Sequence, residues 1–477
     1  MVVPRAGRLL LVVVMLTCCA TLLLGYANKA RCTGPAFDGD GRSTAFVERQ
    51  DAEVCYSDVQ GLWLGRGVDQ HVFPYVHGSL TVNRTLVGGG LEYPVLTGLL
   101  IWAAAIGAHT DAGFLLATAL LLAPFALLTA WLLARMTRWR ALVFTATPPL
   151  VLYAVQNWEL PVVAASVLAV WLVSCWRVAL RRRAVVASVV LGLGFCLKLY
   201  PGAFVAPLSL LVLTGGVGGR ELPAHVRRLD VRGALAVVGA AVATVVAVNL
   251  PFALVGPTGW WASFRFQGGR PTDLSTNSIW YWGLRPLVDR SGSSSGSAGY
   301  EQAVSVASPT LVLVAFAVAL AVGWWRYRRE GTYPWLAVSA AMLCGFLLLH
   351  KVHSPQYTLW LLPFLVLLRV RWPLVVAYLV CDVAMEVGIF RYFDLGLRGQ
   401  LSPGSTSLVP GSTAGLLDHL TPAAVLLGVW GRAALLVVLV VVFLRSTPAG
   451  PGPADQPAQV GSPRPPREAG ARYTSET

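Results

Sequence analysis

The sequence has 477 residues, of which 56% are hydrophobic and only 13% charged, and its formal net charge is +14. This much apolar surface cannot be buried in one or two soluble cores, so the composition indicates a polytopic membrane protein. The basic residues gather in short clusters between apolar runs: "RMTRWR" (135–140), "RVALRRR" (177–183) and "RYRRE" (326–330). Cytoplasmic loops of membrane proteins have this pattern, so the positive charge does not indicate nucleic acid as a partner.

The first apolar run, 9–26, follows Arg5 and Arg8. It has no convincing small-x-small cleavage site, and many further apolar runs follow it. We therefore expect an uncleaved first helix with a cytoplasmic N-terminus rather than a signal peptide. The polar segment after it then lies outside, where an oxidising environment would allow its two cysteines, Cys32 and Cys55, to pair.

The next run, 93–108, decides the topology. If it crossed the membrane, every later arginine cluster would lie outside, so we expect it to stay at the outer interface or to dip back. The remaining crossings are then predicted at 113–134, 141–155, 160–176, 184–197, 201–214, 233–252, 302–325, 333–350, 356–368, 372–390 and 421–444. With the first helix this makes about twelve, and both termini are cytoplasmic. Several runs are shorter than the roughly 17 residues that a spanning helix needs, so the pairs near 184–214 and 333–368 are either packed inside the bundle or wrongly divided.

The prediction is thus an all-α polytopic membrane protein with one transmembrane domain, 1–446, and long outer loops at 27–112 and 253–301. The Pro- and Gly-rich segment 447–477 is expected to be a disordered cytoplasmic tail. On this topology the mixed polar and aromatic clusters gather on the outer side of the cell membrane. Ionisable residues at helix ends inside such a bundle are candidates for function, so we expect one site on the outer face.

The motifs "EYP" (92–94), "NWE" (157–159), "KLYP" (198–201), "NSIWYW" (277–282) and "SPQYTLWLLP" (354–363) occur in this order. Together with an acidic first outer loop, they resemble the bacterial polyprenyl-phosphate-mannose-dependent α-mannosyltransferases of glycosyltransferase family 87, in the GT-C superfamily. The resemblance runs from about residue 5 to 445. It implies a GT-C-like bundle, a lipid-linked donor carrying mannose or arabinose, a glycolipid or glycan acceptor reached from outside, and a catalytic carboxylate in the first outer loop.

Displacement of a polyprenyl phosphate from an anomeric carbon passes through an oxocarbenium-like transition state, as in glycoside hydrolysis. Phosphate is a good leaving group, so one carboxylate that deprotonates the acceptor hydroxyl suffices, and a single displacement inverts the anomeric carbon. Asp58 is the preferred base, because Tyr56, Leu62 and Trp63 beside it can dock against the bundle and stack a sugar. The alternative is that Asp58 only caps a short helix beginning "VQGLW".

The leaving phosphate requires cations or other anion-binding groups. The candidates are Lys198, His350, Lys351, His353, Arg265 and Arg270. In "HKVHSPQY" (350–357), Ser354 is expected to cap a helix whose free N–H groups face an anion. The alternatives are a snorkelling anchor for Lys198, a plain polar loop for 350–357 and solvated charges for the two arginines.

Sugar or acceptor contacts are expected from the polar and aromatic residues of the same motifs: Tyr56, Glu92, Tyr93, Asn157, Glu159, Tyr200, Asn277, Trp280, Gln356 and Tyr357. Glu159 stands where the family more often has Asp, so a role as a precisely placed base is not expected of it. The tryptophans also fit the aromatic belt of a membrane surface.

The sequence contains no histidine or carboxylate array with the spacing of a metal site, so no metal is predicted, although a divalent ion stays open. No GxxxxGK[ST] pattern accompanies the glycine-rich stretches, which disfavours a nucleotide-sugar donor. A transporter or flippase for a lipid-linked glycan is the alternative function. It is expected to place its key residues near the membrane midplane and to show repeat symmetry, and neither feature is evident.

Overall fold

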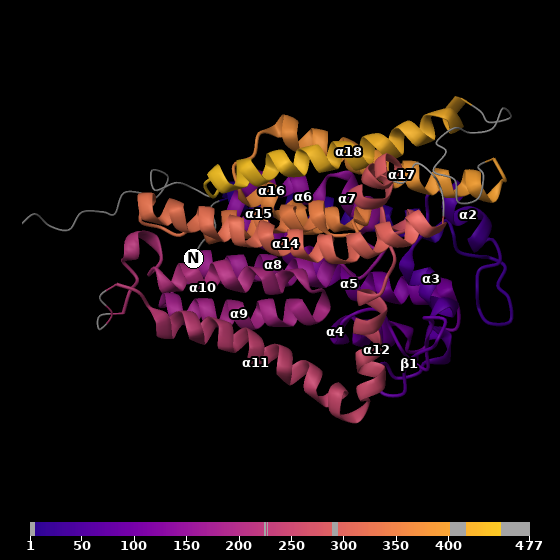
Figure 1. Cartoon of the computed structure of the whole chain (residues 1–477), viewed down its shortest axis with the longest axis horizontal. Helices are drawn as coiled ribbons and strands as arrows, with labels where there is room; N and C mark the ends of the chain where they lie inside the picture. Colours follow the sequence, from indigo (N-terminus) through magenta and orange to yellow (C-terminus); the bar gives the residue numbers. More distant parts are fainter. Residues whose placement is uncertain (1–4, 224–225, 227, 289–293, 401–415, 450–477) are drawn as a thin grey trace, which may run out of the picture.

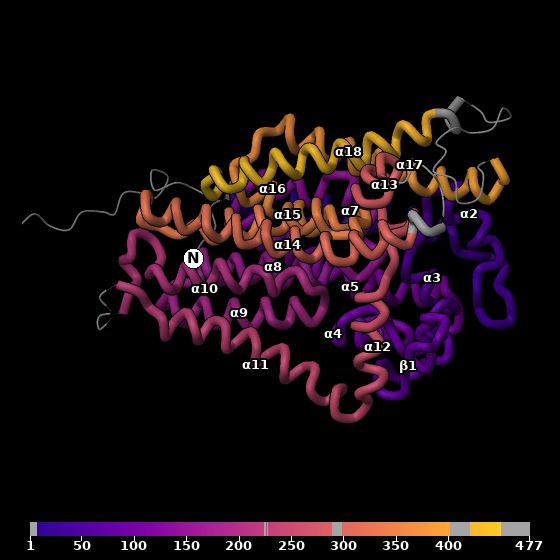
Figure 2. The backbone as a smooth tube through the Cα atoms, viewed as in Figure 1, coloured from indigo at the N-terminus to yellow at the C-terminus, as the bar shows by residue number. Residues whose placement is uncertain are grey.

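A computed structural model of the chain describes residues 5–223, 226, 228–288, 294–400 and 416–449; most of the predicted tail, 450–477, lies outside them. The long helices lie side by side along the longest axis of the molecule (Figure 1), and the chain passes back and forth between the two ends of this bundle (Figure 2). The described residues contain one sheet, an antiparallel hairpin of β1 (Ser79–Leu80) and β2 (Leu86–Val87). The protein is an all-α polytopic membrane protein, which confirms the predicted fold class.

Seven helical segments among the described residues are long and apolar enough to cross a membrane. They correspond to α1 (Arg5–Ala30), α5 (Asp111–Thr137), η3 with α10 (Tyr200–Phe204 and Val205–Leu213), α11 (Val231–Val255), α14 (Ser294–Glu330), α17 (Trp372–Leu397) and α18 (Leu416–Arg445). Each coincides with a crossing that the hydropathy pattern predicts.

The other five predicted crossings also contain helices, but shorter or more polar ones. These are α6 with α7 (Leu142–Thr145 and Pro148–Tyr153), α8 (Leu160–Cys175), α9 (Leu180–Leu197), α15 (Trp335–Leu349) and η7 with α16 (Pro355–Tyr357 and Thr358–Leu367). All ten residues of α16 are buried, as are twelve of the fifteen in α15. A helix surrounded by protein need not match the hydrocarbon thickness, so the short pair at 333–368 lies inside the bundle, one of the two alternatives left by the sequence.

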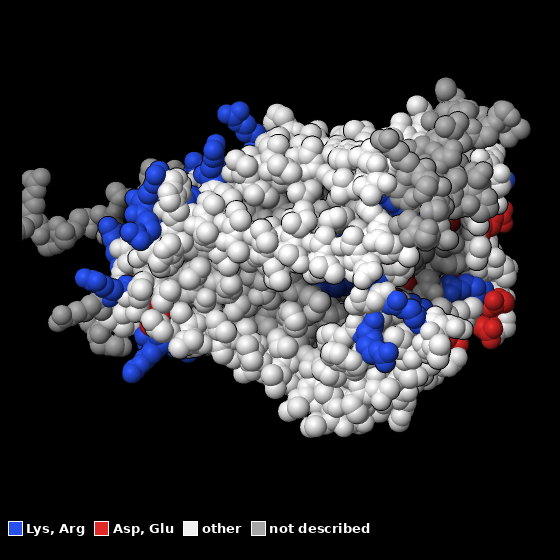
Figure 3. Space-filling view, in the orientation of Figure 1, with Lys and Arg blue, Asp and Glu red and all other residues white. Residues whose placement is uncertain are grey.

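Arginines gather at one end of the bundle, which we call the basic end (Figure 3). There Arg140, in η2 (Arg138–Ala141), donates hydrogen bonds to the last carbonyls of α16, and Arg326 donates to the carbonyl of Leu444. Arg183 forms an ion pair with Glu221, just after η4 (Val217–Gly219). The arginine clusters therefore bind the ends of neighbouring helices as well as facing solvent.

The opposite end, which we call the polar end, is covered by the first long loop. This loop contains α2 (Phe46–Ala52), α3 (Asp58–Gly65), η1 (Val68–Gln70), the β-hairpin and α4 (Val95–Ala105). A disulfide joins Cys32 to Cys55. Trp63 is buried against Phe114 of α5 and donates its indole N–H to the carbonyl of Asp40. The loop is thus a packed cover whose core continues into the bundle.

The segment 93–108, expected to stay at the interface or dip back, contains the single helix α4. Its 11 residues extend about 16 Å, roughly half the hydrocarbon thickness. Thr97 donates its hydroxyl proton to the carbonyl of Leu197, the last residue of α9, at 2.6 Å. The helix therefore packs on the helix ends of the polar end.

The second long loop begins where α11 ends and contains α12 (Pro257–Gly268), η5 (Leu274–Thr276), the π-helical turn η6 (Ile279–Leu284) and α13 (Arg285–Val288). Gly256 and Gly259 let α12 lie directly on the first loop, because a Cβ atom at either position would collide with the carbonyl of Tyr75. The two loops consequently form one cover over the polar end.

Candidate active site

The start of α3 shows whether Asp58 caps this helix, which was the alternative to its role as the base. Ser57 is the N-cap residue, and its hydroxyl accepts the N–H of Val59. Asp58 follows as the first helical residue, and its own N–H donates to the carbonyl of Gln156 at 2.9 Å. The capping role therefore belongs to Ser57, and the carboxylate of Asp58 is not needed to begin the helix.

Two side chains hold the half-buried carboxylate of Asp58 from opposite oxygens. The hydroxyl of Tyr56 donates to Oδ1 at 2.7 Å, and Asn157 Nδ2 donates to Oδ2 at 2.6 Å. Burial and the neighbouring Asp58 carboxylate raise the pKa of Tyr56 well above its usual value, so its phenol stays protonated and donates. A carboxylate has about four acceptor positions, so about two remain for a further hydroxyl.

Lys198 is connected to this carboxylate through Asn157, and its ammonium is engaged by protein groups rather than extended toward the surface as a snorkelling anchor would be. Its ammonium donates to Asn157 Oδ1 at 3.1 Å, lies 3.0 Å from Glu159 Oε1 and sits 4.6 Å from the centre of the Tyr93 ring. Its side chain is 12% exposed, whereas that of Glu159 is fully buried. We call Asp58, Tyr56, Asn157, Glu159 and Lys198 the open cluster.

An aromatic stack continues from the open cluster. The Trp360 ring lies between two tyrosine rings, 3.9 Å from Tyr357 and 4.5 Å from Tyr200 by ring centroids, and its indole N–H donates to Glu159 Oε2. Trp360 is absent from our sequence candidates. Its spacing of three residues from Tyr357, which places both on one helix face, is the signal that could have found it.

The segment 350–357 lies against the second loop. Lys351 donates to the backbone carbonyls of Gly268 and Arg270, at 3.2 and 2.7 Å, and the backbone N–H of His353 donates to the carbonyl of Thr276. His350 stacks on Phe346. The lysine thus holds the end of α12, and a role toward a phosphate stays a prediction.

Burial lowers the pKa of His350 and places that of His353 well below its usual value, so both rings are neutral at neutral pH. Nε2 of His353 is buried and has no hydrogen-bond partner among the described residues. Ser354 occupies the expected N-cap position, but its side chain makes no capping hydrogen bond. The prediction of a serine cap was therefore wrong, because the helix opens with a 3₁₀ turn at Pro355.

The other predicted phosphate ligands lie in the second loop. Arg270 Nη2 donates to Ser275 Oγ at 3.3 Å, and the backbone carbonyl of Arg270 accepts from Lys351. Arg265 is exposed and lines a separate surface cavity formed by α11, α12 and β1. None of the contacts described above for the open cluster involves Arg265.

The remaining predicted sugar contacts are mostly engaged with protein. Glu92 forms an ion pair with Arg66 at 2.6 Å. Trp280 donates its indole N–H to the carbonyl of Leu349, Gln356 is buried, and the carbonyl of Asn277 accepts from Arg432. None of these contacts involves Asp58, and the side-chain Oδ1 of Asn277 is buried without a hydrogen-bond partner among the described residues.

A second charged group lies deeper in the bundle and is absent from our sequence candidates. Lys29 Nζ donates to Gln156 Oε1 at 3.1 Å and lies 3.9 Å from Glu386 Oε1. Arg432 Nη1 lies 3.7 Å from Asp382 Oδ1. We call Lys29, Asp382, Glu386 and Arg432 the sealed cluster, because each is at most 1% exposed.

The apolar runs themselves carried the signal for the sealed cluster. Asp382 and Glu386 are four residues apart within 372–390, and Arg432 lies within 421–444. Charges in such runs are costly unless they are paired. The sequence could flag them, but it could not pair them with Lys29, which lies more than 350 residues away along the chain.

Metal ligation has little support among the described residues, where no group of three His, Cys, Asp or Glu side chains could hold an ion. In the open cluster, Glu159 is engaged by Lys198 and Trp360, while Asp58 accepts only from neutral donors. The arrangement can therefore accept a proton from a hydroxyl group and present an ammonium close by.

A family model described as "Mannosyltransferase (PIG-M)" matches residues 162–386, which include Lys198 and the 350–357 segment but not Asp58. No curated protein matches the sequence. One solved structure, the apo oligosaccharyltransferase of Archaeoglobus fulgidus, is similar at 11% identity with a TM-score of 0.32; the alignment covers 91% of this chain and 56% of that chain. This likeness is too distant to carry an argument. The family match supports a membrane glycosyltransferase.

Proposed function

We propose that this protein transfers a sugar, most consistently mannose, from a polyprenyl-phosphate donor to a glycolipid or glycan acceptor at the outer face of the membrane. The family match supports the sugar and the reaction class. The single observation that carries the site is the half-buried carboxylate of Asp58, which neutral donors hold on both oxygens and which forms no ion pair with any described residue.

In the proposed reaction, Asp58 accepts the proton of an acceptor hydroxyl as that oxygen attacks the anomeric carbon. The bond from this carbon to the phosphate oxygen breaks as the new bond forms, and its electron pair leaves with the polyprenyl phosphate. The attack comes from the face opposite the leaving group, so the product is inverted. Positioned bases of this kind contribute about 10²–10⁴-fold to rate.

Lys198 supplies a positive charge that is linked to Asp58 through Asn157. Its contacts with Asn157 and Glu159 fix the ammonium before a substrate arrives, and a preorganised cation stabilises the charge that develops on a leaving phosphate. The ring of Tyr357 stacks on Trp360, whose indole N–H donates to Glu159, the ion-pair partner of Lys198. The donor phosphate is therefore proposed to lie beside Lys198 and Tyr357, with Arg270 and Lys351 on its second-loop side.

Two anchors hold the peptide segment that binds Asp58. Lys29 donates to the side-chain oxygen of Gln156, and the backbone carbonyl of Gln156 accepts the N–H of Asp58. Lys198 binds the side chain of Asn157, whose amide holds the carboxylate. Two of the three lysines in the chain thus fix the two adjacent residues that position the proposed base.

Transfer from radiolabelled polyprenyl-phosphate-mannose to membrane glycolipid by the purified protein in vesicles tests the proposal. We expect wild type to transfer the sugar and Asp58→Asn to lose about 10²–10⁴-fold of the rate while keeping its elution profile. Asp40→Asn, on an exposed aspartate of the same loop, is the matched control. If Asp58→Asn transfers the sugar at the normal rate, Asp58 is not the base. If wild type transfers no sugar from mannose- or arabinose-carrying donors, the protein is not the proposed glycosyltransferase.

The proposed face of the membrane needs its own test. Ser275 is exposed in the second loop, and Arg182 lies at the basic end. Single cysteines at these positions, in a chain whose exposed Cys19 and Cys175 are replaced by serine, should react with an impermeant thiol reagent from outside at 275 only. Labelling of position 182 from outside would show that the protein has the opposite orientation in the membrane.

A further inference from the structure

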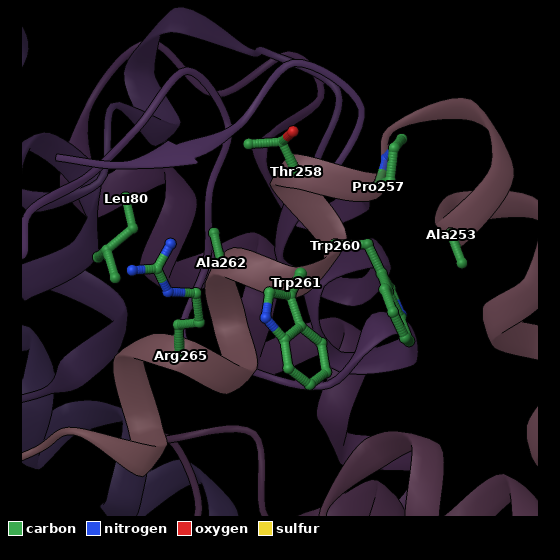
Figure 4. Close-up of a pocket in the computed structure, with 8 residues that line it drawn as sticks. All are labelled: Leu80, Ala253, Pro257, Thr258, Trp260, Trp261, Ala262 and Arg265. Atoms are coloured by element: carbon green, nitrogen blue, oxygen red, sulfur yellow. The ribbon is translucent and has the colours of Figure 1, made fainter.

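A cavity of about 460 Å³ lies where α11 meets α12 and the β-hairpin. It is lined by Leu80, Ala253, Pro257, Thr258, Trp260, Trp261, Ala262 and Arg265. Figure 4 shows the guanidinium of Arg265 between Leu80 and the ring of Trp261. Cavities of this size accommodate a small ligand or part of a larger one.

The aromatic wall of the cavity is built before any ligand arrives. The rings of Trp260 and Trp261 lie 5.8 Å apart, and both contact Phe264. The indole N–H of Trp260 donates to Asn249 Oδ1 of α11 at 3.0 Å, which ties the wall to the spanning helix. Preorganisation of this kind reduces the ordering cost of binding.

The cavity opens at the end of a helix that faces lipid. Only 17% of the spanning window of α11 is buried within the protein, and Leu250, Leu254 and Val255 in its last turns are exposed. Its 25 residues extend about 37 Å, slightly more than the hydrocarbon core. Ala253, which lines the cavity, therefore lies where the hydrocarbon region meets the headgroups.

The cavity combines apolar walls with one positive charge. Arg265 is the single charged lining residue, and its guanidinium has no hydrogen bond or ion pair within the described part of the chain. A guanidinium binds phosphate through two parallel hydrogen bonds. Since no lining carboxylate competes for it, the cavity suits an anionic group attached to an apolar chain.

We propose that this cavity binds an anionic bilayer phospholipid, with the phosphate on Arg265 and the upper acyl chain against Trp260, Trp261 and α11. A bilayer phospholipid fits better than a lipid-linked sugar because the lining contains no carboxylate that could bind or activate a sugar hydroxyl beside the phosphate. The site is independent of the proposed transferase reaction.

Photo-crosslinking tests this lipid site. The full-length protein is placed in phosphatidylcholine vesicles with a small fraction of phosphatidylglycerol that carries a diazirine near the top of its acyl chain, and labelled peptides are located by mass spectrometry. We expect labelling within residues 250–265, reduced about tenfold in Arg265→Gln and in Leu80→Glu, which places a carboxylate opposite the guanidinium. Arg329→Gln is the matched control, because Arg329 also lies over an exposed tryptophan, Trp325, but does not line this cavity.

Excess unlabelled phosphatidylglycerol should remove the label, whereas phosphatidylcholine and inorganic phosphate should not. Equal labelling of wild type and both cavity variants would overturn the proposal and leave an ordinary aromatic belt. Preferential competition by polyprenyl phosphate would also overturn it, because the occupant would then be a lipid-linked phosphate. Should Arg265→Gln fail to fold, Leu80→Glu decides by itself.

Discussion

The open cluster and the sealed cluster contain the same kinds of residue but differ in charge balance and in access. The sealed cluster pairs two cations with two carboxylates, and no member is more than 1% exposed. The open cluster has two carboxylates and one cation; Lys198 pairs with Glu159, which leaves Asp58 with neutral donors only. A balanced, buried cluster fixes helices relative to one another. An unbalanced cluster in which Asp58 is only half-buried keeps one carboxylate available for chemistry.

The largest effect on stability is expected from Arg432→Met. It leaves Asp382 without its cation and removes the hydrogen bond to the carbonyl of Asn277, and removal of one partner of a buried ion pair costs about 3–5 kcal/mol. Thermal unfolding in detergent should show a large loss, partly restored in Arg432→Met/Asp382→Asn. A stable Arg432→Met protein that no longer transfers sugar would break the comparison, because the sealed cluster would then act in the reaction.

In the open cluster, Lys198→Gln is expected to lower kcat by about 10²-fold, the usual cost of losing one preorganised group at a developing negative charge. Stability should fall as well, because the fully buried Glu159 then loses its cation and keeps only the hydrogen bond from Trp360. Lys198→Arg keeps the charge with a different shape and should recover part of the rate. An unchanged kcat in Lys198→Gln with a lower melting temperature would reduce this lysine to a structural role.

The link between the two clusters is tested by Lys29→Met/Glu386→Gln, which removes the ion pair without leaving a lone buried charge. Gln156 then loses its side-chain anchor, and its peptide positions Asp58 less precisely. We expect kcat to fall about fivefold to tenfold with KM for the donor unchanged, since misplacement remote from the reacting atoms lowers rates without removing contacts. Equal changes in KM and kcat would point to a general loosening of the bundle.

The smallest effect concerns pH. Folded His353 stays neutral because burial holds its pKa well below 6.5, whereas the unfolded chain binds a proton near that value. Since the unfolded state binds more protons as the pH falls below about 6.5, this residue should cost up to about 1.4 kcal/mol of stability per pH unit.

The melting temperature should therefore fall less steeply between pH 7.5 and pH 5 in His353→Gln than in wild type. His77→Gln, at an exposed histidine, is the control and should follow wild type. Identical slopes in all three proteins would show that His353 is protonated in the folded state.

Each predicted crossing is helical because hydropathy acts locally: a run of apolar side chains forms a helix that buries its backbone wherever the run lies in the sequence. The expectation that 93–108 does not cross rests instead on distant residues, because a crossing there would put every later arginine cluster outside. Capping was harder to predict, since Ser57 and Asp58 are both favoured N-cap residues, and the Gln156 carbonyl that fixes the start of α3 belongs to a distant segment.

The sequence alone determined the membrane class and the positions of the helices, because composition and run length express themselves locally; Asp58 and Lys198 stay its predictions for the site. Only the tertiary structure decided the partners. It joined Lys198 to Glu159, and Lys29 to Glu386, and it placed Arg265 in a cavity between α11, α12 and β1. Ion pairs and cavities arise where helices distant in sequence meet, and no periodicity within a single helix specifies which neighbour it will face.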